Sequence, residues 1–470
     1  MDTKKLRQKI LDLAIRGKLV PQDPNDEPAS VLLERIRAEK EQLIKDGKIK
    51  RAKKSAASDK SHYENVPYKL PNGWCWCKLG DLCSFESGFA FSSNDFKTSG
   101  IPLVRISNIQ DSTVTLKNCV FIQDEVDEKY IIKTGDLLIA MSGATTGKMG
   151  IYSMRQRALL NQRVGNICVQ SRYLTANYRN YFMYSQSDVI LKMAYGGAQP
   201  NISSQMILNI PIPLPPLSEQ YRIVNAIKNL LEIVDRIEEN QISLDKFLCS
   251  IKQKILQLAL SGNLLTQDHN DEPAVDLLRR INPSYIPCDN RHYENLPTGW
   301  QLAKIKDVFT INPKNKVDDD IDAGFVSMAM IDDGYRDSYQ FEKKKWTLIK
   351  NGFTHFKDGD IAVAKISPCL ENRKSMILKN LPNGIGAGTT ELHIFRSAIV
   401  DPKFALYFFK SDHFINQCVG TFNGVVGQQR VGKNIIEDII FPLPPYKEQR
   451  RISEKITQIF MYLDKITAEL

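Results

Sequence analysis

Residues 8–36, QKILDLAIRGKLVPQDPNDEPASVLLERI, recur with most letters unchanged at residues 253–281 as QKILQLALSGNLLTQDHNDEPAVDLLRRI. A second block follows each copy: HYENVPYKLPNGW at residues 62–74 returns as HYENLPTGW at residues 292–300. Self-similarity at a long, fixed period indicates a duplicated structural unit. The sequence therefore predicts two copies of one module.

A third block closes each copy. PLPPLSEQYRI at residues 213–223 returns as PLPPYKEQRRI at residues 442–452. The proline cluster ends one element just before a helical pattern begins. Between the second and third blocks lie two inserts of similar length, 62–208 and 292–437, whose sequences have diverged. The scaffold is thus repeated, whereas the inserts differ.

The central scaffold segment carries a heptad pattern. Its apolar positions are Ile223, Ile227, Leu230, Val234, Ile237, Leu244, Leu248, Ile251, Ile255 and Leu258, with Gln241 as the polar occupant of the same seam. Alternating steps of four and three are typical of a coiled coil. The C-terminal copy matches the first part of this seam and the N-terminal copy matches the last part. We therefore expect the two chain ends to abut, with Leu470 near Met1.

The predicted fold class is α+β. Two mixed, mostly β domains are joined by an antiparallel pair of long coiled-coil helices, in a pseudo-twofold and circular arrangement. The predicted segments are a helical region at 1–61 that completes the second scaffold helix, an insert domain at 62–208, a central helix and connector at 209–291, an insert domain at 292–437 and a C-terminal helix at 438–470.

Composition narrows the class of protein. The chain has no apolar run of membrane-spanning length, and its nine cysteines are irregularly spaced. We expect free thiols and a cytoplasmic location, without a zinc site at Cys75, Cys77 and Cys83, which lack a fourth ligand. The net charge of +9 suits a polyanionic partner but is common in proteins that bind none.

Polar side chains lie beside the predicted strand ends of both inserts. Such side chains suit base edges and phosphates, because Asn and Gln pair with adenine, Arg and Lys pair with guanine, and hydroxyls position phosphates. In the first insert the candidates are Arg105, Ser107, Asn108, Thr145, Thr146, Lys148, Asn161, Gln162, Arg163, Gln199 and Asn201. In the second they are Lys365, Ser367, Arg373, Lys374, Thr389, Thr390, Gln428, Gln429 and Arg430. For each residue, an ordinary solvated loop position is the alternative.

Several stretches of the sequence partly match catalytic or nucleotide-binding motifs, but none matches fully. The run from Gly143 to Lys148 has three residues between its glycines, where a phosphate-binding loop has four, and Met149 stands where that loop has Ser or Thr. The proline clusters lack the Asn or Asp of adenine methyltransferases, and the run 342–344, Glu-Lys-Lys, reads as solvated charge. We expect no catalytic residues and no metal bound by this chain.

The motifs together resemble the specificity subunit of type I restriction-modification enzymes over essentially the whole chain. The first copy carries GFAFSSNDF from Gly88, GIPLVRISNI from Gly100, GDLLIAMSGATTGKMG from Gly135, LNQRVG from Leu160, GAQPNIS from Gly197 and PLPPLSEQYRIV from Pro213. The second insert matches less closely, and GAGTTELHIFR from Gly386 is its best block.

This resemblance implies two target recognition domains that each bind one half of a bipartite DNA site, with scaffold helices that set the spacer. It also implies two modification subunits that carry S-adenosylmethionine and methylate adenine, and restriction motor-nuclease subunits that use ATP and magnesium. This chain itself would bind none of these cofactors. Because the inserts differ, we expect an asymmetric site.

Two other classes of function compete with this interpretation. A stand-alone DNA-binding transcriptional regulator would also need two DNA-reading domains. Genes for a methyltransferase and a helicase-nuclease beside this one would discriminate against that regulator. A single-chain restriction enzyme would require catalytic motifs that the sequence lacks.

Overall fold

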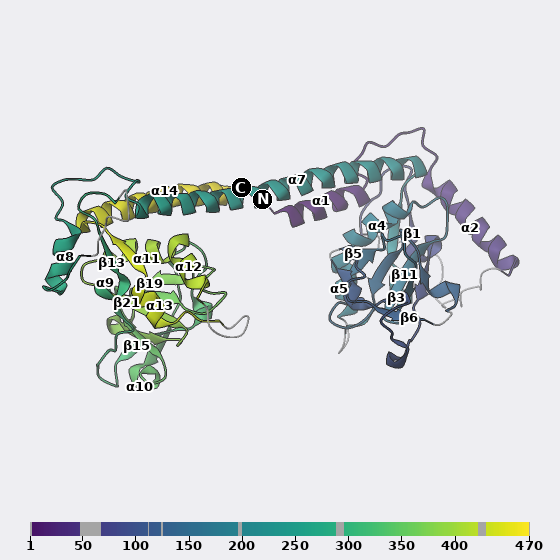
Figure 1. The fold of residues 1–470 in the computed structure, drawn as a ribbon. Coiled ribbons are helices and arrows are strands. Elements are labelled where there is room, and N and C mark those ends of the chain that lie inside the picture. The colour runs from purple at the N-terminus through teal and green to yellow at the C-terminus, as the bar shows by residue number, and fades with distance from the viewer. Residues whose placement is uncertain are drawn as a thin grey trace. The chain divides into compact units, whose positions relative to one another are not determined.

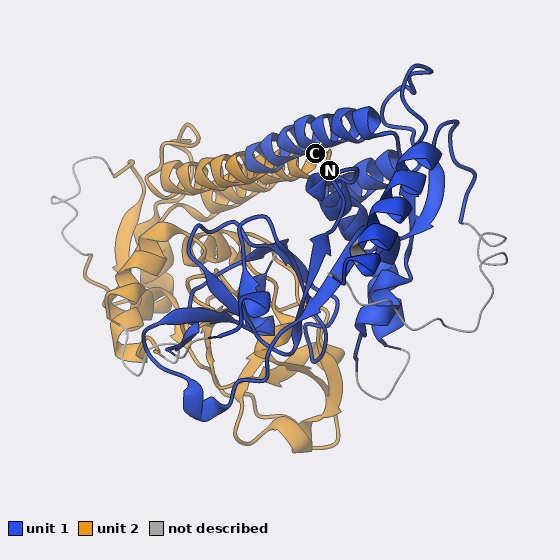
Figure 2. Ribbon diagram, turned by 90° about the vertical axis from the view of Figure 1, so that its right-hand side faces the viewer, with its two compact units in different colours: residues 1–240 blue, residues 241–470 orange. Residues whose placement is uncertain are grey.

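The computed structural model divides into two compact units, residues 1–240 and 241–470 (Figure 2). It describes residues 2–47, 67–110, 112–123, 126–195, 200–287, 296–421 and 429–469. Both units mix helices and sheets, which confirms the predicted α+β class. Figure 1 labels the elements named below.

Unit 1 contains two sheets and one short strand pair among its described residues. The six-stranded sheet has the order β2 (Cys83–Ser87), β11 (Val164–Val169), β8 (Leu137–Ala140), β9 (Met149–Ile151), β5 (Ser112–Val114) and β4 (Ile109–Gln110). The four-stranded sheet has the order β6 (Val120–Ile122), β3 (Ile101–Val104), β10 (Ala158–Leu160) and β7 (Ile131–Ile132). Strand β1 (Cys75–Lys78) pairs with β12 (Pro211–Leu214). The helices are α1 (Thr3–Ile15), α2 (Ala29–Lys45), α3 (Leu79–Leu82), α4 (Ala176–Ser185), α5 (Ser187–Ala194) and α6 (Ser204–Leu208).

Unit 2 repeats this plan. One sheet has the order β14 (Thr310–Ile311), β21 (Leu392–Arg396), β18 (Ile361–Ala364) and β19 (Ser375–Ile377). The other has the order β16 (Glu342–Lys345), β15 (Asp322–Val326), β20 (Ile385–Gly388) and β17 (Thr354–Lys357). Strand β13 (Gln301–Lys304) pairs with β22 (Ile440–Leu443). The helices are α8 (Ala274–Ile281), α9 (Ile305–Val308), α10 (Trp346–Ile349), α11 (Pro402–Phe409), α12 (Asp412–Val419), α13 (Lys433–Asp438) and α14 (Tyr446–Glu469). The predicted duplication is therefore confirmed at the level of topology.

One interior strand in each unit, β8 in unit 1 and β18 in unit 2, shows why the apolar runs of the inserts form sheets. All four residues of β8, LLIA, are buried, and so are all four of β18, IAVA. A strand that is buried on both faces needs apolar residues at every position, not at alternate ones. These strands place the polar segments that follow them at the end of a rigid sheet.

The heptad pattern forms one continuous helix, α7 (Leu217–Leu260), of 44 residues. In unit 1, α1 lies beside its first half, where the Arg7 guanidinium donates to Glu238 at 2.9 Å (Figure 1). In unit 2, α14 lies beside the second half, where Lys252 pairs with Asp464. Both neighbours run antiparallel to α7, as predicted. The predicted proximity of Met1 and Leu470 lies outside the described residues.

The repeated Glu-Gln dipeptide of the proline block fixes the start of each scaffold helix. The Gln220 side chain accepts a hydrogen bond from the Thr175 amide at 2.9 Å and donates to the Tyr173 carbonyl at 3.0 Å. In unit 2, Gln449 accepts from the Asp401 amide at 2.7 Å. Each Gln therefore ties its helix to the segment before α4 or α11, which explains why this dipeptide recurs.

No helix among the described residues combines the length and apolar character that crossing a membrane would need.

Candidate nucleic-acid interface

In unit 1, the predicted polar residues follow the ends of adjacent strands. Strands β3 and β10 are parallel neighbours, with Val104 opposite Leu160. Beyond them, the Asn161 amide donates to the Val104 carbonyl at 3.2 Å, which places Asn161 next to Arg105. Because parallel strands end at the same edge of a sheet, the segments 105–108 and 161–163 emerge side by side.

Two further predicted segments join this edge. The Met141 amide donates to the Arg163 carbonyl at 2.9 Å, and the Ile202 amide donates to the Met141 carbonyl at 2.9 Å. The Thr146 hydroxyl reaches the Pro200 carbonyl at 3.3 Å. We define the unit 1 loop cluster as residues 105–108, 141–148, 161–163 and 200–202. The structure thus brings together segments that are far apart in the sequence.

Some candidate residues of the unit 1 loop cluster are exposed to solvent, whereas others are buried. Five side chains are exposed, namely Ser107, Lys148, Gln162, Arg163 and Asn201. Asn108 and Thr146 are buried instead. Asn108 accepts from the Arg105 amide at 3.0 Å and donates to the Thr115 carbonyl at 3.0 Å, so its amide shapes the turn. Gln199 lies outside the described residues.

Two candidates of this cluster hold unsatisfied polar atoms. Within the described part of the chain, Arg105 Nε and Thr145 Oγ1 are buried without a hydrogen-bond partner. A buried polar atom without a partner costs about 1–3 kcal/mol, which a ligand could recover by supplying a donor or acceptor. The two atoms therefore mark places where the cluster is incomplete by itself.

The run from Gly143 to Lys148 is a hairpin between β8 and β9. The Gly147 amide donates to the Ala140 carbonyl at 2.8 Å, and the Lys148 amide donates to the Thr145 carbonyl at 3.0 Å. A phosphate-binding loop connects a strand to a helix N-terminus, whereas this turn connects two antiparallel strands. The run therefore lacks the strand-to-helix connection of a phosphate-binding loop.

Unit 2 builds the same arrangement. The Lys365 amide donates to the Glu391 carbonyl at 3.0 Å, and the Val431 amide donates to the Lys365 carbonyl at 3.0 Å. The Ser367 amide donates to the Gln429 carbonyl at 2.9 Å. We define the unit 2 loop cluster as residues 365–374, 389–391 and 429–431. Gln428 lies outside the described residues.

The two clusters differ in charge at matching positions. Arg163 of unit 1 corresponds to Glu391 of unit 2, because both carbonyls accept from the residue that follows β8 or β18. Glu391 forms a two-pronged ion pair with Arg430, with N–O distances of 2.8 and 2.9 Å. The hydrogen bonds from Arg430 lower the pKa of the Glu391 carboxyl. Thr390 is exposed between these segments, and Thr389 is half-buried.

Two basic candidates of unit 2 already form hydrogen bonds and ion pairs within the protein. The Arg373 guanidinium pairs with Asp412 and donates from Nε to the Lys410 carbonyl at 3.1 Å. Lys374 donates from Nζ to the Ile331 carbonyl at 2.8 Å. Their side chains are only 16% and 18% exposed, so they offer less to a ligand than the sequence alone suggested.

A buried lysine beside this cluster escaped the sequence analysis. Lys410 is fully buried, and its ammonium donates to the carbonyls of Gly334 at 2.7 Å and Arg373 at 2.8 Å. Burial lowers the pKa of Lys410 to about 7. The residue type does not indicate this burial, because lysine is almost always exposed in folded proteins.

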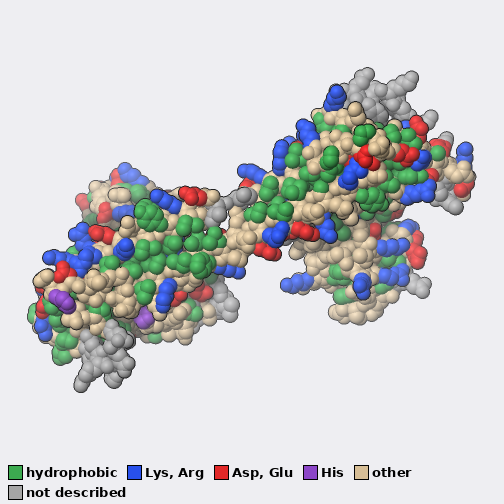
Figure 3. All heavy atoms as spheres, turned by 90° about the horizontal axis from the view of Figure 1, so that it is seen from above, with side chains coloured by type: hydrophobic (Ala, Val, Ile, Leu, Met, Phe, Trp, Pro, Cys, Tyr) green, Lys and Arg blue, Asp and Glu red, His purple; other side chains and the backbone are tan. Residues whose placement is uncertain are grey.

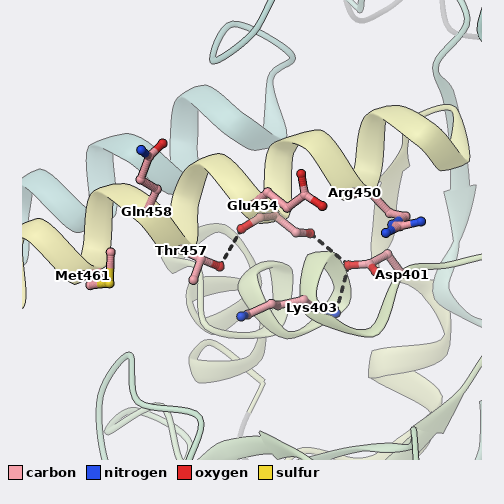
Figure 4. A pocket seen from close by; sticks show the side chains of 8 residues that line it. Asp401, Lys403, Arg450, Glu454, Thr457, Gln458 and Met461 are labelled. Carbon is pink, nitrogen blue, oxygen red and sulfur yellow. Dashed lines mark hydrogen bonds between the residues drawn. The ribbon is translucent and has the colours of Figure 1, made fainter.

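A groove in unit 2 lies between α11 and α14, and none of its lining residues belongs to the unit 2 loop cluster (Figure 4). Its lining residues are Asp401, Lys403, Arg450, Ser453, Glu454, Thr457, Gln458 and Met461. Asp401 accepts hydrogen bonds from the Lys403 amide at 3.1 Å and the Ser453 hydroxyl at 2.9 Å. Asp401 therefore joins the first turn of α11 to the scaffold helix. Across the described residues, no group of three or more His, Cys, Asp or Glu side chains could hold a metal ion.

The scaffold helices expose apolar side chains (Figure 3). Tyr221 and Ile233 of α7 are 56% and 43% exposed in unit 1, and Met461 and Tyr462 of α14 are 50% and 54% exposed in unit 2. Apolar groups that gather on an exposed surface commonly indicate a protein contact. These four residues belong to neither loop cluster.

Comparison with known proteins shows the family. The model of the type I restriction modification DNA specificity domain matches residues 71–244 and again residues 297–470. The chain belongs to this family. Each match covers most of one insert and the proline block that follows it.

Individual relatives agree with this assignment. The specificity subunit of the type I restriction enzyme EcoAI from Escherichia coli is 39% identical over 236 residues, which cover 46% of this chain and 40% of that protein. The EcoKI specificity subunit from Escherichia coli K12 is 23% identical over 416 residues, or 86% of this chain and 85% of that one. A solved structure described as "Structural basis underlying complex assembly and conformational transition of the type I R-M system" matches with a TM-score of 0.57 and 18% identity. That match covers 86% of this chain and 94% of the solved chain, and it is a likeness of fold.

Proposed function

We propose that this chain is the sequence-specific DNA-binding specificity subunit of a type I restriction-modification complex. It reads an asymmetric bipartite site and directs adenine methylation or restriction by partner subunits in the cytoplasm. The observation that carries this proposal is the pair of loop clusters, which occupy corresponding places in two units of one topology but present different side chains.

The chemistry of the unit 1 loop cluster supports DNA readout. Asn161 and Gln162 carry amides that can pair bidentately with adenine N6 and N7, whereas Arg163 and Lys148 supply cations for guanine or phosphate. These side chains project from turns whose backbones are hydrogen-bonded to neighbouring strands. A rigid frame lowers the entropy cost of binding, which favours sequence discrimination.

Catalysis is assigned to partners in this proposal. Two modification subunits carry S-adenosylmethionine, and motor-nuclease subunits use ATP and magnesium, whereas this chain supplies recognition alone. The exposed apolar side chains on α7 and α14 support docking of such partners. An adenine in each half-site is presented for extrusion from the duplex, because a methyltransferase cannot reach its target atom inside the base stack.

A footprint with the full-length chain and its co-expressed methyltransferase subunit tests the proposal. We expect protection of two short blocks of unrelated sequence, separated by a spacer without sequence preference. A palindromic footprint would contradict the assignment of different half-sites to different units. Specific binding that leaves DNA methylation unchanged when the chain is removed would instead favour a transcriptional regulator.

A further inference from the structure

An exposed aromatic ring adjoins the unit 1 loop cluster. Phe89 lies two residues beyond the end of β2, and 46% of its surface is exposed. Much of this apolar side chain therefore stays in contact with solvent, and Phe89 is not among the polar candidates named above. Its position therefore requires a separate explanation.

The Phe89 backbone is part of the cluster. Its amide donates to the Leu160 carbonyl at 2.9 Å, and its carbonyl accepts from the Gln162 amide at 2.9 Å. Phe89 and Asn161 thus form an isolated parallel bridge. A Cβ atom at Gly88 would lie 2.2 Å from the Asn161 carbonyl oxygen, so the close approach of the two segments needs glycine there.

Two neighbouring rings hold the Phe89 side chain. Its centroid lies 5.0 Å from that of Phe91 in an edge-on arrangement and 5.3 Å from that of Tyr130. Aromatic pairs at such separations contribute about 0.5–1.5 kcal/mol beyond the area they bury. The ring is therefore both exposed and ordered, which is the state that a preformed contact surface requires.

Unit 2 places a polar residue at the matching position. Phe85 of β2 corresponds to Ile311 of β14, because each pairs with the equivalent residue of β11 or β21. Counted four residues onward along the sequence, Phe89 matches Asn315. The Asn315 side-chain Nδ2 donates to the Phe356 carbonyl at 2.7 Å, so this side chain is directed into the protein. The exposed ring is a property of unit 1 and of the half-site that unit 1 reads.

We propose that Phe89 is a specificity-determining residue that packs against the 5-methyl group of a thymine. This inference rests on the proposed function and deepens it. In the major groove an A·T pair presents adenine N6 and N7, which suit an amide, beside the thymine methyl, which suits an apolar side chain. Asn161 and Gln162 adjoin Phe89 through the hydrogen bonds above, so amide and ring together match one A·T pair.

The test uses a random duplex library prepared either with thymine or with uracil in its place. The full-length chain with its co-expressed methyltransferase subunit selects from both libraries, and Phe89→Ala is selected in parallel. Removing one buried methyl group weakens binding about fourfold. We expect wild-type preference for one A·T pair in one half-site to fall about fourfold on uracil, and Phe89→Ala to show the same loss on thymine with no further loss on uracil.

The same selections distinguish a failure of the thymine contact from a failure of the proposed function. If Phe89→Ala selects as the wild type does, or if uracil leaves the wild-type preference unchanged, the contact with the thymine methyl is wrong while the proposed function stands. If the wild type enriches no bipartite sequence from the thymine library, the proposed function itself fails.

A second variant guards against misfolding. Phe89→Leu keeps an apolar side chain beside Phe91 and Tyr130 and removes only the ring. If Phe89→Ala abolishes the whole half-site, Phe89→Leu should still change one base pair and keep the other positions. Loss of the entire half-site in both variants would overturn the inference.

Discussion

Trp74 donates its indole N–H to the Glu219 carboxylate at 2.9 Å, and Trp300 makes the same bond to Glu448 at 3.0 Å. Both glutamates are 1% exposed, and burial raises the pKa of both carboxyl groups. Trp74 ends the second repeated block and Glu219 lies in the third. These bonds show why blocks so distant in sequence are repeated together: they join each insert domain to the start of its scaffold helix.

Trp74→Phe should lower the free energy of unfolding of unit 1 by about 1–3 kcal/mol, because Glu219 Oε2 loses its buried donor. Hydrogen exchange of unit 1 peptides in the full-length chain measures this loss. Trp76→Phe is the matched control. Within the described residues the Trp76 indole N–H is buried without a partner, so its removal should cost no hydrogen bond. Equal destabilisation by both variants would show that the Glu219 bond contributes nothing.

Glu391→Gln should raise the affinity of the second unit for non-specific DNA and blunt its base preference. The substitution removes the charge that neutralises Arg430 in the unit 2 loop cluster. One additional phosphate contact steepens the dependence of log affinity on log salt by about 0.9. Titration of duplex DNA at several salt concentrations measures this slope. An unchanged slope would place Arg430 away from the DNA backbone.

Lys410 predicts a pH dependence of stability in unit 2. Its pKa is about 7 when folded, against an ordinary lysine value of 10.5. Between these values the unfolded chain binds a proton that the folded chain does not, so stability should rise with pH. The urea midpoint of unit 2 should therefore increase more between pH 7 and pH 10 in the wild type than in Lys410→Met. Parallel pH profiles would refute the lowered pKa.

The repeats and heptads predicted the duplicated topology and the continuous α7, because both depend on periodic apolar positions. The polar residues beside predicted strand ends include Arg105 and Asn161, but the sequence did not predict that their segments meet at one sheet edge. The sequence did not predict which candidate side chains are buried and hydrogen-bonded within the protein. Asn108 and Thr146 are residue types that could contact DNA, yet both are buried and their side chains bond to the protein's own backbone.

Two other features needed three-dimensional structure. The pairing of Glu391 with Arg430 joins residues distant in sequence, and neither residue type alone indicates it. In the sequence, Phe89 belongs to the GFAFSSNDF block, which does not indicate whether its ring is buried or exposed. The bridge to Asn161 holds the Phe89 backbone, and 46% of the residue's surface is exposed. Long-range backbone contacts thus decide which side chains reach solvent.

The length of α7 should set the spacer between half-sites. Deleting 239–242 removes about 6 Å of helix and no fully buried residue, because these positions are exposed or half-buried. We expect the spacer to change length while both half-site sequences stay the same. Replacing the same four residues by alanine preserves the length and should leave the spacer unchanged. Altered half-sites with an unchanged spacer would refute the claim that the length of α7 sets the spacer.

The most direct test of the central claim is a map of methylated adenines in host DNA with and without the gene for this chain. We predict one asymmetric bipartite sequence, with methylated adenine in each half-site, that loses its methylation when the gene is deleted. Exchanging residues 67–208 for those of a relative should replace one half-site and preserve the other. Methylation that persists after deletion, or a palindromic methylated sequence, would contradict the account.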